Sequence, residues 1–250
     1  MPRLLFEPYT YEYENLKISV FDVPDITGAT RDIIDQEISN ICKGNNQTDL
    51  LLVKKELKRR SSSWSDFQKM GAVAEFFIHL YMKTQDYKQE FLFFNLEEGS
   101  LKKGFDGLYT KGDEFWVMES KTGENTAHES KVREAFNDLS DKITTNVANN
   151  PWQNAYNHAA HRDVGSAERL LTDLRRMEED FENDRYQNIE EQNVMPCATV
   201  FLGGVWTEQN HENIVQTIKN INTLLGKKIH VVCVTQASYD AFFEYLEEQQ

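Results

Sequence analysis

Two carboxylates and a lysine lie close together in one short stretch of this sequence. Asp106 belongs to a Gly-Phe-Asp-Gly segment, and Glu119 and Lys121 belong to the Trp-Val-Met-Glu-Ser-Lys segment that follows it. Neighbouring acids repel each other, and a fold accommodates them when a cation, commonly a divalent metal, sits between them. Two acids with a nearby lysine are the groups that metal-dependent hydrolysis of a phosphodiester uses.

The sequence predicts that these groups face one another on a β-hairpin. Residues 105–110 and 114–120 are rich in aromatic and β-branched side chains, which favour strands. Gly112-Asp113 between them suits a two-residue turn of the primed type, because glycine readily adopts a positive φ. With that turn, Asp106 lies directly opposite Glu119, with Cβ atoms about 4.5–5.5 Å apart.

Lys121 completes the predicted group, because alternate residues of a strand point to the same face and Lys121 follows Glu119 by two positions. The residue opposite Lys121 is Gly104, which has no side chain and is expected to leave room for a substrate. The other face of the hairpin is predicted to carry Phe105, Tyr109, Trp116 and Met118. The alternative is a solvated hairpin end with an ordinary surface salt bridge, which would contribute little to stability.

A third acid, Glu75, lies in the middle of a segment that is apolar almost all round. Residues 70–81 read Met-Gly-Ala-Val-Ala-Glu-Phe-Phe-Ile-His-Leu-Tyr, which predicts a buried helix. A carboxylate in such surroundings is costly unless it is paired or bound to a metal. Glu75 either reaches solvent or pairs with His79, or it is a third acid directed at the same metal site.

This order of elements resembles the PD-(D/E)XK nuclease superfamily: a helix with an acid, a strand, a hairpin with Asp and Glu-x-Lys, and an amphipathic helix. The resemblance covers about residues 65–147, with Phe105 in place of the family's proline. It matches the family's site residues to Glu75, Asp106, Glu119 and Lys121. The implied activity is Mg²⁺-dependent cleavage or nicking of DNA, with Mn²⁺ able to replace Mg²⁺.

The resemblance also implies a role for each residue. The metal ligands would be Glu75, Asp106, Glu119 and the backbone carbonyl of Ser120, and Lys121 would hold the attacking water or stabilise charge at phosphorus. The segment Gly-Phe-Asp-Gly-Leu together with Glu-Ser-Lys resembles the nuclease subunit of Hachiman-type anti-phage systems, which implies a helicase or ATPase partner. The alternative is a catalytically silent subunit with a nuclease fold that binds DNA or a protein partner.

The rest of the chain predicts an α/β fold with a restriction-endonuclease-like core, in which a mixed central sheet is flanked by helices. Strands at 198–203 and 229–235 enclose a helical stretch at 208–225, which is the pattern of a parallel βαβ unit. Residues 1–64 are expected to form an N-terminal extension, with a strand within 9–23 and two helices, packed on a nuclease-like domain of residues 65–250. Further helices are predicted at 31–42, at 49–60, at 132–147 and after Ser166 as N-cap.

The net charge of −14 argues against a simple nucleic-acid-binding protein, because acidic surfaces repel polyanions. Residues 177–193 carry seven acids and one arginine. The basic run at 54–60 is either a contact to the DNA backbone or a solvated helix face. We therefore expect that the chain binds free DNA poorly and that a partner delivers the substrate.

Other residues predict no further chemistry. Cys42, Cys197 and Cys233 match no zinc-binding spacing and indicate buried thiols in a reducing compartment. His158 and His161 are interpreted as ordinary polar histidines. No signal peptide and no membrane-spanning segment is recognised, so a cytoplasmic location is expected.

Overall fold

The computed structural model describes residues 7–44, 48–94, 104–161 and 164–248. The strands are β1 (Tyr9–Tyr13), β2 (Leu16–Val23), β3 (Lys88–Gln89), β4 (Gly107–Lys111), β5 (Glu114–Glu124), β6 (Asn193–Phe201) and β7 (Lys228–Gln236). The helices are α1 (Gly28–Lys43), α2 (Leu50–Ser61), α3 (Asp66–Thr84), α4 (His128–Thr144), α5 (Pro151–Ala159), α6 (Glu168–Glu182), α7 (His211–Lys219), α8 (Asp240–Glu247) and the 3₁₀ helix η1 (Ile189–Glu191).

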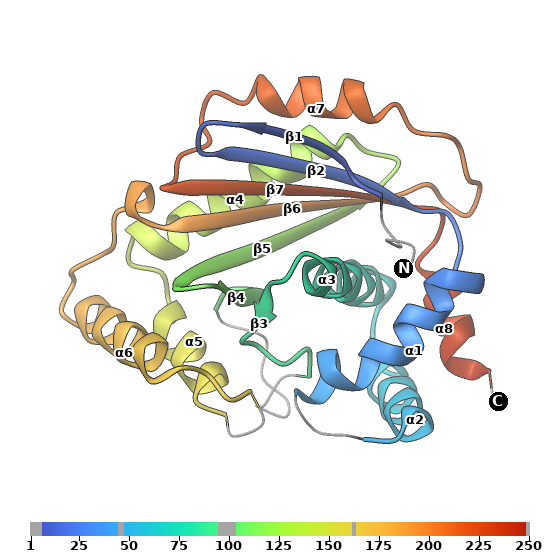
Figure 1. The fold of residues 1–250 in the computed structure, drawn as a ribbon, viewed down its shortest axis with the longest axis horizontal. Coiled ribbons are helices and arrows are strands. Elements are labelled where there is room, and N and C mark those ends of the chain that lie inside the picture. Colours follow the sequence, from blue (N-terminus) through green and yellow to red (C-terminus); the bar gives the residue numbers. More distant parts are fainter. Residues whose placement is uncertain (1–6, 45–47, 95–103, 162–163, 249–250) are drawn as a thin grey trace.

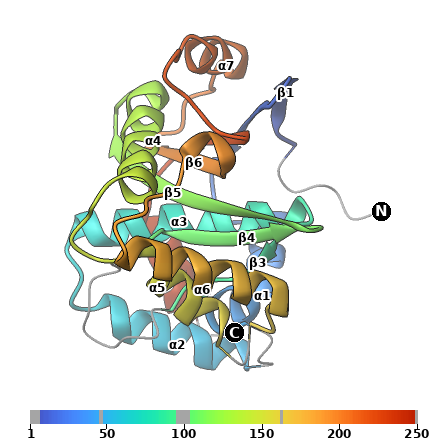
Figure 2. The ribbon, with the colours of Figure 1, turned by 90° about the vertical axis from the view of Figure 1, so that its left-hand side faces the viewer.

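These strands form one mixed sheet with helices on both faces (Figures 1 and 2). The strand order is β1-β2-β7-β6-β5-β4-β3. β2, β7, β6 and β5 are parallel to one another, and antiparallel neighbours flank them at both edges. The prediction of an α/β fold with a mixed sheet between helices is therefore confirmed.

One face of the sheet is covered by α1, α2, α3 and α8 (Figure 1). Their apolar side chains form a buried cluster with Tyr109, Trp116 and Met118 of the β4–β5 hairpin. α3 begins with a capping box between Ser65 and Gln68, which satisfies N–H groups of its first turn. Nearly all of its side chains from 73 to 82 are buried, as predicted for this segment.

The other face is covered by α4, α5, α6 and α7, whose apolar side chains form a second cluster with Leu108 and Val117. Phe105 also belongs to this cluster, and its ring centroid lies 5.0 Å from that of Trp152. The prediction that Phe105 shares a face with Tyr109 is therefore wrong. β4 begins only at Gly107, so the alternation of a strand does not extend back to Phe105.

Several predicted boundaries change in the structure. Residues 9–23 form two strands rather than one, and β2 pairs with β7 inside the sheet. The predicted parallel βαβ unit is present, but α7 ends at Lys219 and β6 begins at Asn193. α6 has Ala167 as its N-cap, because the hydroxyl of Ser166 donates instead to Glu90 at 2.5 Å. The division of the chain at residue 64 stays a prediction.

Candidate active site

The β4–β5 hairpin has the predicted register. Tyr109 pairs with Trp116 and Gly107 with Met118, and Gly112 occupies the turn with a φ of 60°. A glycine tolerates this positive φ without the clash that a Cβ would introduce. The backbone N–H of Asp106 donates to the carbonyl of Met118 at 3.0 Å, which is one residue out of this register, so the regular pairing ends at Gly107 and Asp106 lies beside the end of the hairpin at Ser120.

The carboxylate of Asp106 ends the hairpin. Its Oδ2 accepts a hydrogen bond of 2.9 Å from the backbone N–H of Ser120, where β4 no longer supplies a partner. This bond fixes the orientation of Asp106. The N–H and C=O groups of one residue in a strand point to the same neighbour, so the carbonyl of Ser120 is directed to the side on which Asp106 lies.

Glu119 is a buried carboxylate with only 2% of its surface exposed. Its Oε1 accepts a hydrogen bond from Lys121 at 3.0 Å, and its Oε2 accepts one from Lys142 at 2.5 Å. Burial raises the pKa of Glu119 to about 7, repulsion by Asp106 adds to this, and the two lysines oppose it. The pair of neighbouring acids that the sequence predicts is therefore present. The ammonium groups of Lys121 and Lys142 partly neutralise its negative charge.

Lys121 is held between two acids. Its ammonium forms salt bridges with Glu119 and with Asp138 of α4. Burial alone would lower the pKa of Lys121, but these carboxylates outweigh it and hold the pKa above its ordinary value. The expected room beside Gly104 is not open, because a Cβ on this glycine would lie 2.7 Å from Oδ1 of Asn154.

Glu75 approaches this region from the other side of the sheet. It is half-buried on α3, whereas Glu119 extends toward α4 on the opposite face. Burial is the main cause that raises the pKa of the Tyr109 hydroxyl, and the charges of Glu75 and Asp106 add to it. Both acids therefore lie within electrostatic range of Tyr109. The structure thus brings Asp106, Glu119 and Lys121 into one cluster, and it places Glu75 on α3 within electrostatic range of Tyr109.

The donor set suits a hard divalent cation only in part. Within the described residues, no group of three or more His, Cys, Asp or Glu side chains is arranged to hold a metal ion. Asp106, Glu119 and the Ser120 carbonyl nevertheless offer adjacent oxygen donors, and Mg²⁺ in proteins is often held by one or two carboxylates with several waters. The raised pKa of Glu119 beside Asp106 indicates that this pair would gain from a further cation.

α4 supplies two residues that the sequence interpretation missed. Asp138 and Lys142 lie four positions apart, so they share one face of the helix and reach Lys121 and Glu119. They are next to Leu139 and Ile143 of the buried stripe. An acid and a base at this spacing, beside the apolar stripe of the helix that follows the hairpin, is the signal that could have identified them.

The basic run on α2 is partly used within the fold. Lys54 is buried with its ammonium 3.7 Å from the ring centroid of Tyr245, and Arg60 binds Glu56 at 2.8 Å. The exposed basic side chains of the run are Lys55, Lys58 and Arg59. A contact between this run and DNA would therefore depend on only part of it.

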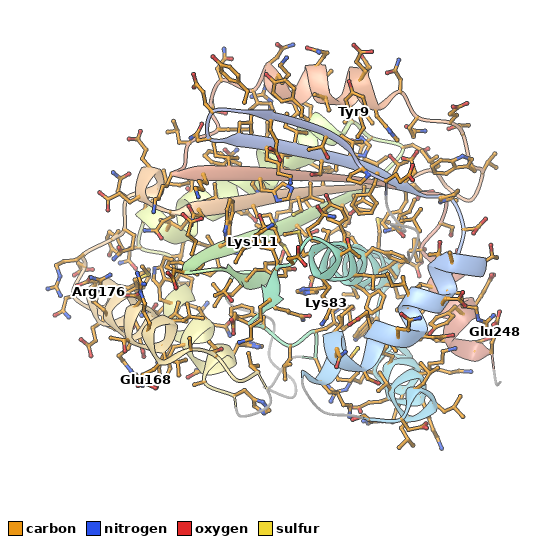
Figure 3. All side chains as sticks on the ribbon, viewed as in Figure 1. Tyr9, Lys83, Lys111, Glu168, Arg176 and Glu248 are labelled. Atoms are coloured by element: carbon orange, nitrogen blue, oxygen red, sulfur yellow. The ribbon has the colours of Figure 1, made fainter. Side chains whose placement is uncertain are left out.

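The acidic segment is integrated into the second cluster. Phe181 and Ile189 are buried in that cluster, and Glu178 is buried against Arg175. Arg176 and Glu168 project outward from α6, as the labelled side chains show (Figure 3). The exposed acids of this segment include Glu179, Glu190 and Glu191.

His158 and the three cysteines are buried in the core of the protein. His158 is buried with its ring stacked on Phe91 at a centroid distance of 4.5 Å. All three cysteines are buried and free, and burial raises the pKa of each thiol. No helix in the described ranges is long and apolar enough to cross a membrane.

Comparison with known proteins places the chain in a family. The family model named HamA matches residues 19–249, which include the hairpin, α3, α4 and the whole sheet apart from β1 and the first residues of β2. No curated protein matches the sequence. Because the model spans most of its length, the chain belongs to the HamA family, the protein family associated with Hachiman defence systems.

Proposed function

We propose that this protein is a Mg²⁺-dependent DNA endonuclease or nickase of the PD-(D/E)XK type, acting as the effector of a Hachiman anti-phage system together with a helicase. The observation that carries the proposal is the buried Glu119 beside Asp106, with Lys121 bound to it. Membership of the HamA family supports the role in defence. A scaffold has no need to keep two adjacent acids in a partly buried site, since their repulsion opposes folding.

Each of the proposed site residues would have a distinct role. Asp106 and Glu119 would hold the divalent cation with the Ser120 carbonyl, and Glu75 would contribute directly or through water. The cation would acidify a water molecule and neutralise charge on the scissile phosphate. Lys121 stays protonated, because Glu119 and Asp138 raise its pKa, and its ammonium would orient the attacking water or stabilise charge at phosphorus.

The charge distribution supports a partner-dependent enzyme. The whole chain carries a net charge of −14, and Lys54 and Arg60 of the basic run on α2 are engaged in internal contacts. Long-range repulsion would slow the approach of DNA to such a surface. A helicase that holds the strand would supply the affinity that this chain lacks.

The test is nicking of supercoiled plasmid by the chain together with its helicase partner. We expect nicking with Mg²⁺ or Mn²⁺, no nicking with EDTA, and no nicking by Lys121→Ala. Glu129→Gln is the matched control, because Glu129 pairs with Arg133 on the exposed side of α4. Nicking by Lys121→Ala at the wild-type rate would overturn the site assignment.

A second candidate is a catalytically silent subunit that binds DNA or a protein. It is favoured by the lysines on both oxygens of Glu119 and by the lack, in the described ranges, of a group of three or more metal-binding side chains. The same assay separates the two, because a silent subunit gives no nicking with the partner present and no difference between wild type and Lys121→Ala.

A further inference from the structure

Both oxygens of Glu119 are occupied by ammonium groups of this chain, and only one of them belongs to the motif that the sequence identifies. We propose that Lys142 is a built-in counter-cation of the site, which holds Glu119 while no metal is bound and is released toward the substrate phosphate when the site is loaded. This inference rests on the proposed function and adds a positioning residue to it.

The burial of Glu119 makes a counter-cation necessary. The side chain of Glu119 is 3% exposed, and Asp106 repels it from the neighbouring strand. A carboxylate in such a place stays ionised only with positive partners close by. Lys121 alone contacts one oxygen, at 3.0 Å, and Lys142 contacts the other at 2.5 Å. Each oxygen of Glu119 therefore has a cationic partner from this chain.

The two lysines differ in how firmly they are held. Lys121 is bound at two points, by Glu119 and by Asp138. Glu119 is the only salt-bridge partner of Lys142 among the described residues. A divalent cation that takes Glu119 as a ligand therefore displaces Lys142 more easily than Lys121.

The released ammonium keeps a favourable position. Lys142 lies in the last turn of α4, and a cation near the C-terminus of a helix is stabilised by the exposed carbonyl groups there. Its side chain is 21% exposed, so the ammonium can move from Glu119 toward a bound phosphate without crossing the core. A phosphate oxygen accepts the hydrogen bond that the carboxylate gives up.

This arrangement couples metal binding to substrate binding. Without a phosphate, the cation competes with Lys142 for Glu119, and its affinity is reduced. With a phosphate present, Lys142 has a new partner, and both ligands bind more tightly together than alone. The device would keep a DNA-cutting site poorly loaded with metal until DNA is in place.

The test measures Mn²⁺ binding to the full chain by electron paramagnetic resonance, at about pH 8.5, above the pKa of about 7 for Glu119. Wild type, Lys142→Met and Lys142→Arg are compared, with Arg133→Met as the control that removes one cation from the same helix away from Glu119. In the absence of DNA, Lys142→Met should bind Mn²⁺ about tenfold more tightly than wild type, because a competing charge is gone. Lys142→Arg and Arg133→Met should bind as wild type does.

A second measurement tests whether Lys142 contacts the substrate phosphate after it has left Glu119. A short duplex should tighten Mn²⁺ binding to the wild type but not to Lys142→Met, and Lys142→Met with the helicase should cut more slowly at saturating metal. Unchanged or weaker Mn²⁺ binding by a folded Lys142→Met, checked by circular dichroism, would overturn the inference and leave Lys142 as a structural brace. If that variant does not fold, equal Mn²⁺ affinity of Lys142→Gln and wild type overturns it instead.

The outcomes separate this inference from the proposed function. Tighter Mn²⁺ binding by Lys142→Met in a chain that cuts no DNA with its partner would retain the counter-cation and reject the nuclease. Cutting by the wild type with no effect of Lys142→Met on Mn²⁺ affinity would retain the nuclease and reject the counter-cation.

Discussion

Two buried glutamates of this molecule sit in contrasting surroundings. Glu90 is 1% exposed and accepts hydrogen bonds from the hydroxyls of Thr110 and Ser166 and from the ammonium of Lys88. Glu119 is 2% exposed, but it lies beside a second acid and relies on two lysine side chains. Two short hydroxyls from two other segments of the fold hold Glu90 together with Lys88, whereas the side chains that hold Glu119 are both lysines.

The difference supports the proposal that Glu90 is structural and that Glu119 is available for chemistry. Two partners of Glu90 are hydroxyls at fixed positions on β4 and before α6. The partners of Glu119 can exchange with a ligand, because lysine side chains rotate freely once released. Burial alone therefore does not identify a functional acid, and the nature of its partners does.

The largest expected effect tests this contrast at Glu119. Glu119→Gln should lower the rate of plasmid nicking by the complex about a thousandfold, because the carboxylate that would hold the metal loses its charge. The fold should be at least as stable as the wild type, since repulsion by Asp106 is removed. Nicking rates of the wild type and Glu119→Gln at about pH 8 check the loss of activity, and thermal melting of both proteins checks the stability. A stable variant that nicks normally would remove Glu119 from the site.

The pH dependence of nicking should follow the same carboxylate. Burial raises the pKa of Glu119 to about 7, so protonation below this pH removes a ligand, and the rate should fall about tenfold for each further pH unit.

The effect on stability has the opposite sign. The pKa of Glu119 in the folded state lies above its ordinary value of 4.5, so ionised Glu119 destabilises the fold above about pH 7, and this cost is lost as the pH falls toward 4.5. Comparing wild type with Glu119→Gln isolates this contribution from the other titrating groups. A pH profile of nicking that is flat between about pH 5 and 8 would contradict the assignment.

Substitution of Glu90 should lower the stability of the fold and leave nicking nearly unchanged, which is the reverse of the effect expected at Glu119. Glu90→Ala leaves Lys88, Thr110 and Ser166 without their common acceptor, and we expect a loss of about 3 kcal/mol in the free energy of unfolding. Urea denaturation measures it, with Glu12→Ala as the control for an exposed ion pair worth less than about 1 kcal/mol. Nicking per folded molecule should stay within about twofold of wild type. A stable Glu90→Ala protein without activity would reverse the two roles.

The smallest expected effect concerns the exposed acids of 177–193. Deleting residues 178–191 would remove Phe181 and Ile189 from the core, so substitution is the cleaner experiment. Changing Glu179, Glu190 and Glu191 together to Gln should strengthen binding of the isolated chain to duplex DNA about twofold to fivefold at low salt. The control with equal charge changes Glu208, Glu212 and Glu244, which are exposed elsewhere. Equal gains in both proteins would show that only net charge matters.

The sequence predicts the local part of the site well. Gly112 defines the turn, and the register of the hairpin then brings Asp106 close to Glu119 without any knowledge of the rest of the fold. The long helices and the parallel strands were also predictable, because their apolar patterns are strong. These predictions of helices, strands and hairpin register succeed because each depends only on residues that are close together in the sequence.

The remaining features depend on docking between distant segments. Lys142 reaches Glu119 only because α4 packs on that face of β5, and Asn154 fills the space at Gly104 only because α5 lies there. Ser166 matches the pattern of a helix cap, yet its hydroxyl finds Glu90, a residue 76 positions earlier. Local rules could not anticipate these contacts, since each is decided by tertiary packing.

The double position of Asp106, at the end of a strand and in the proposed site, affects how this protein can evolve. One oxygen of its carboxylate serves as the missing partner of the Ser120 N–H. The side chain that completes the strand end is therefore the same one that we propose as a metal ligand. Asparagine would keep the strand end and remove the charge, whereas alanine would remove both. A lineage that loses the chemistry can thus retain the fold through asparagine, and an asparagine at this position would be the signature of a relative that has stopped cutting.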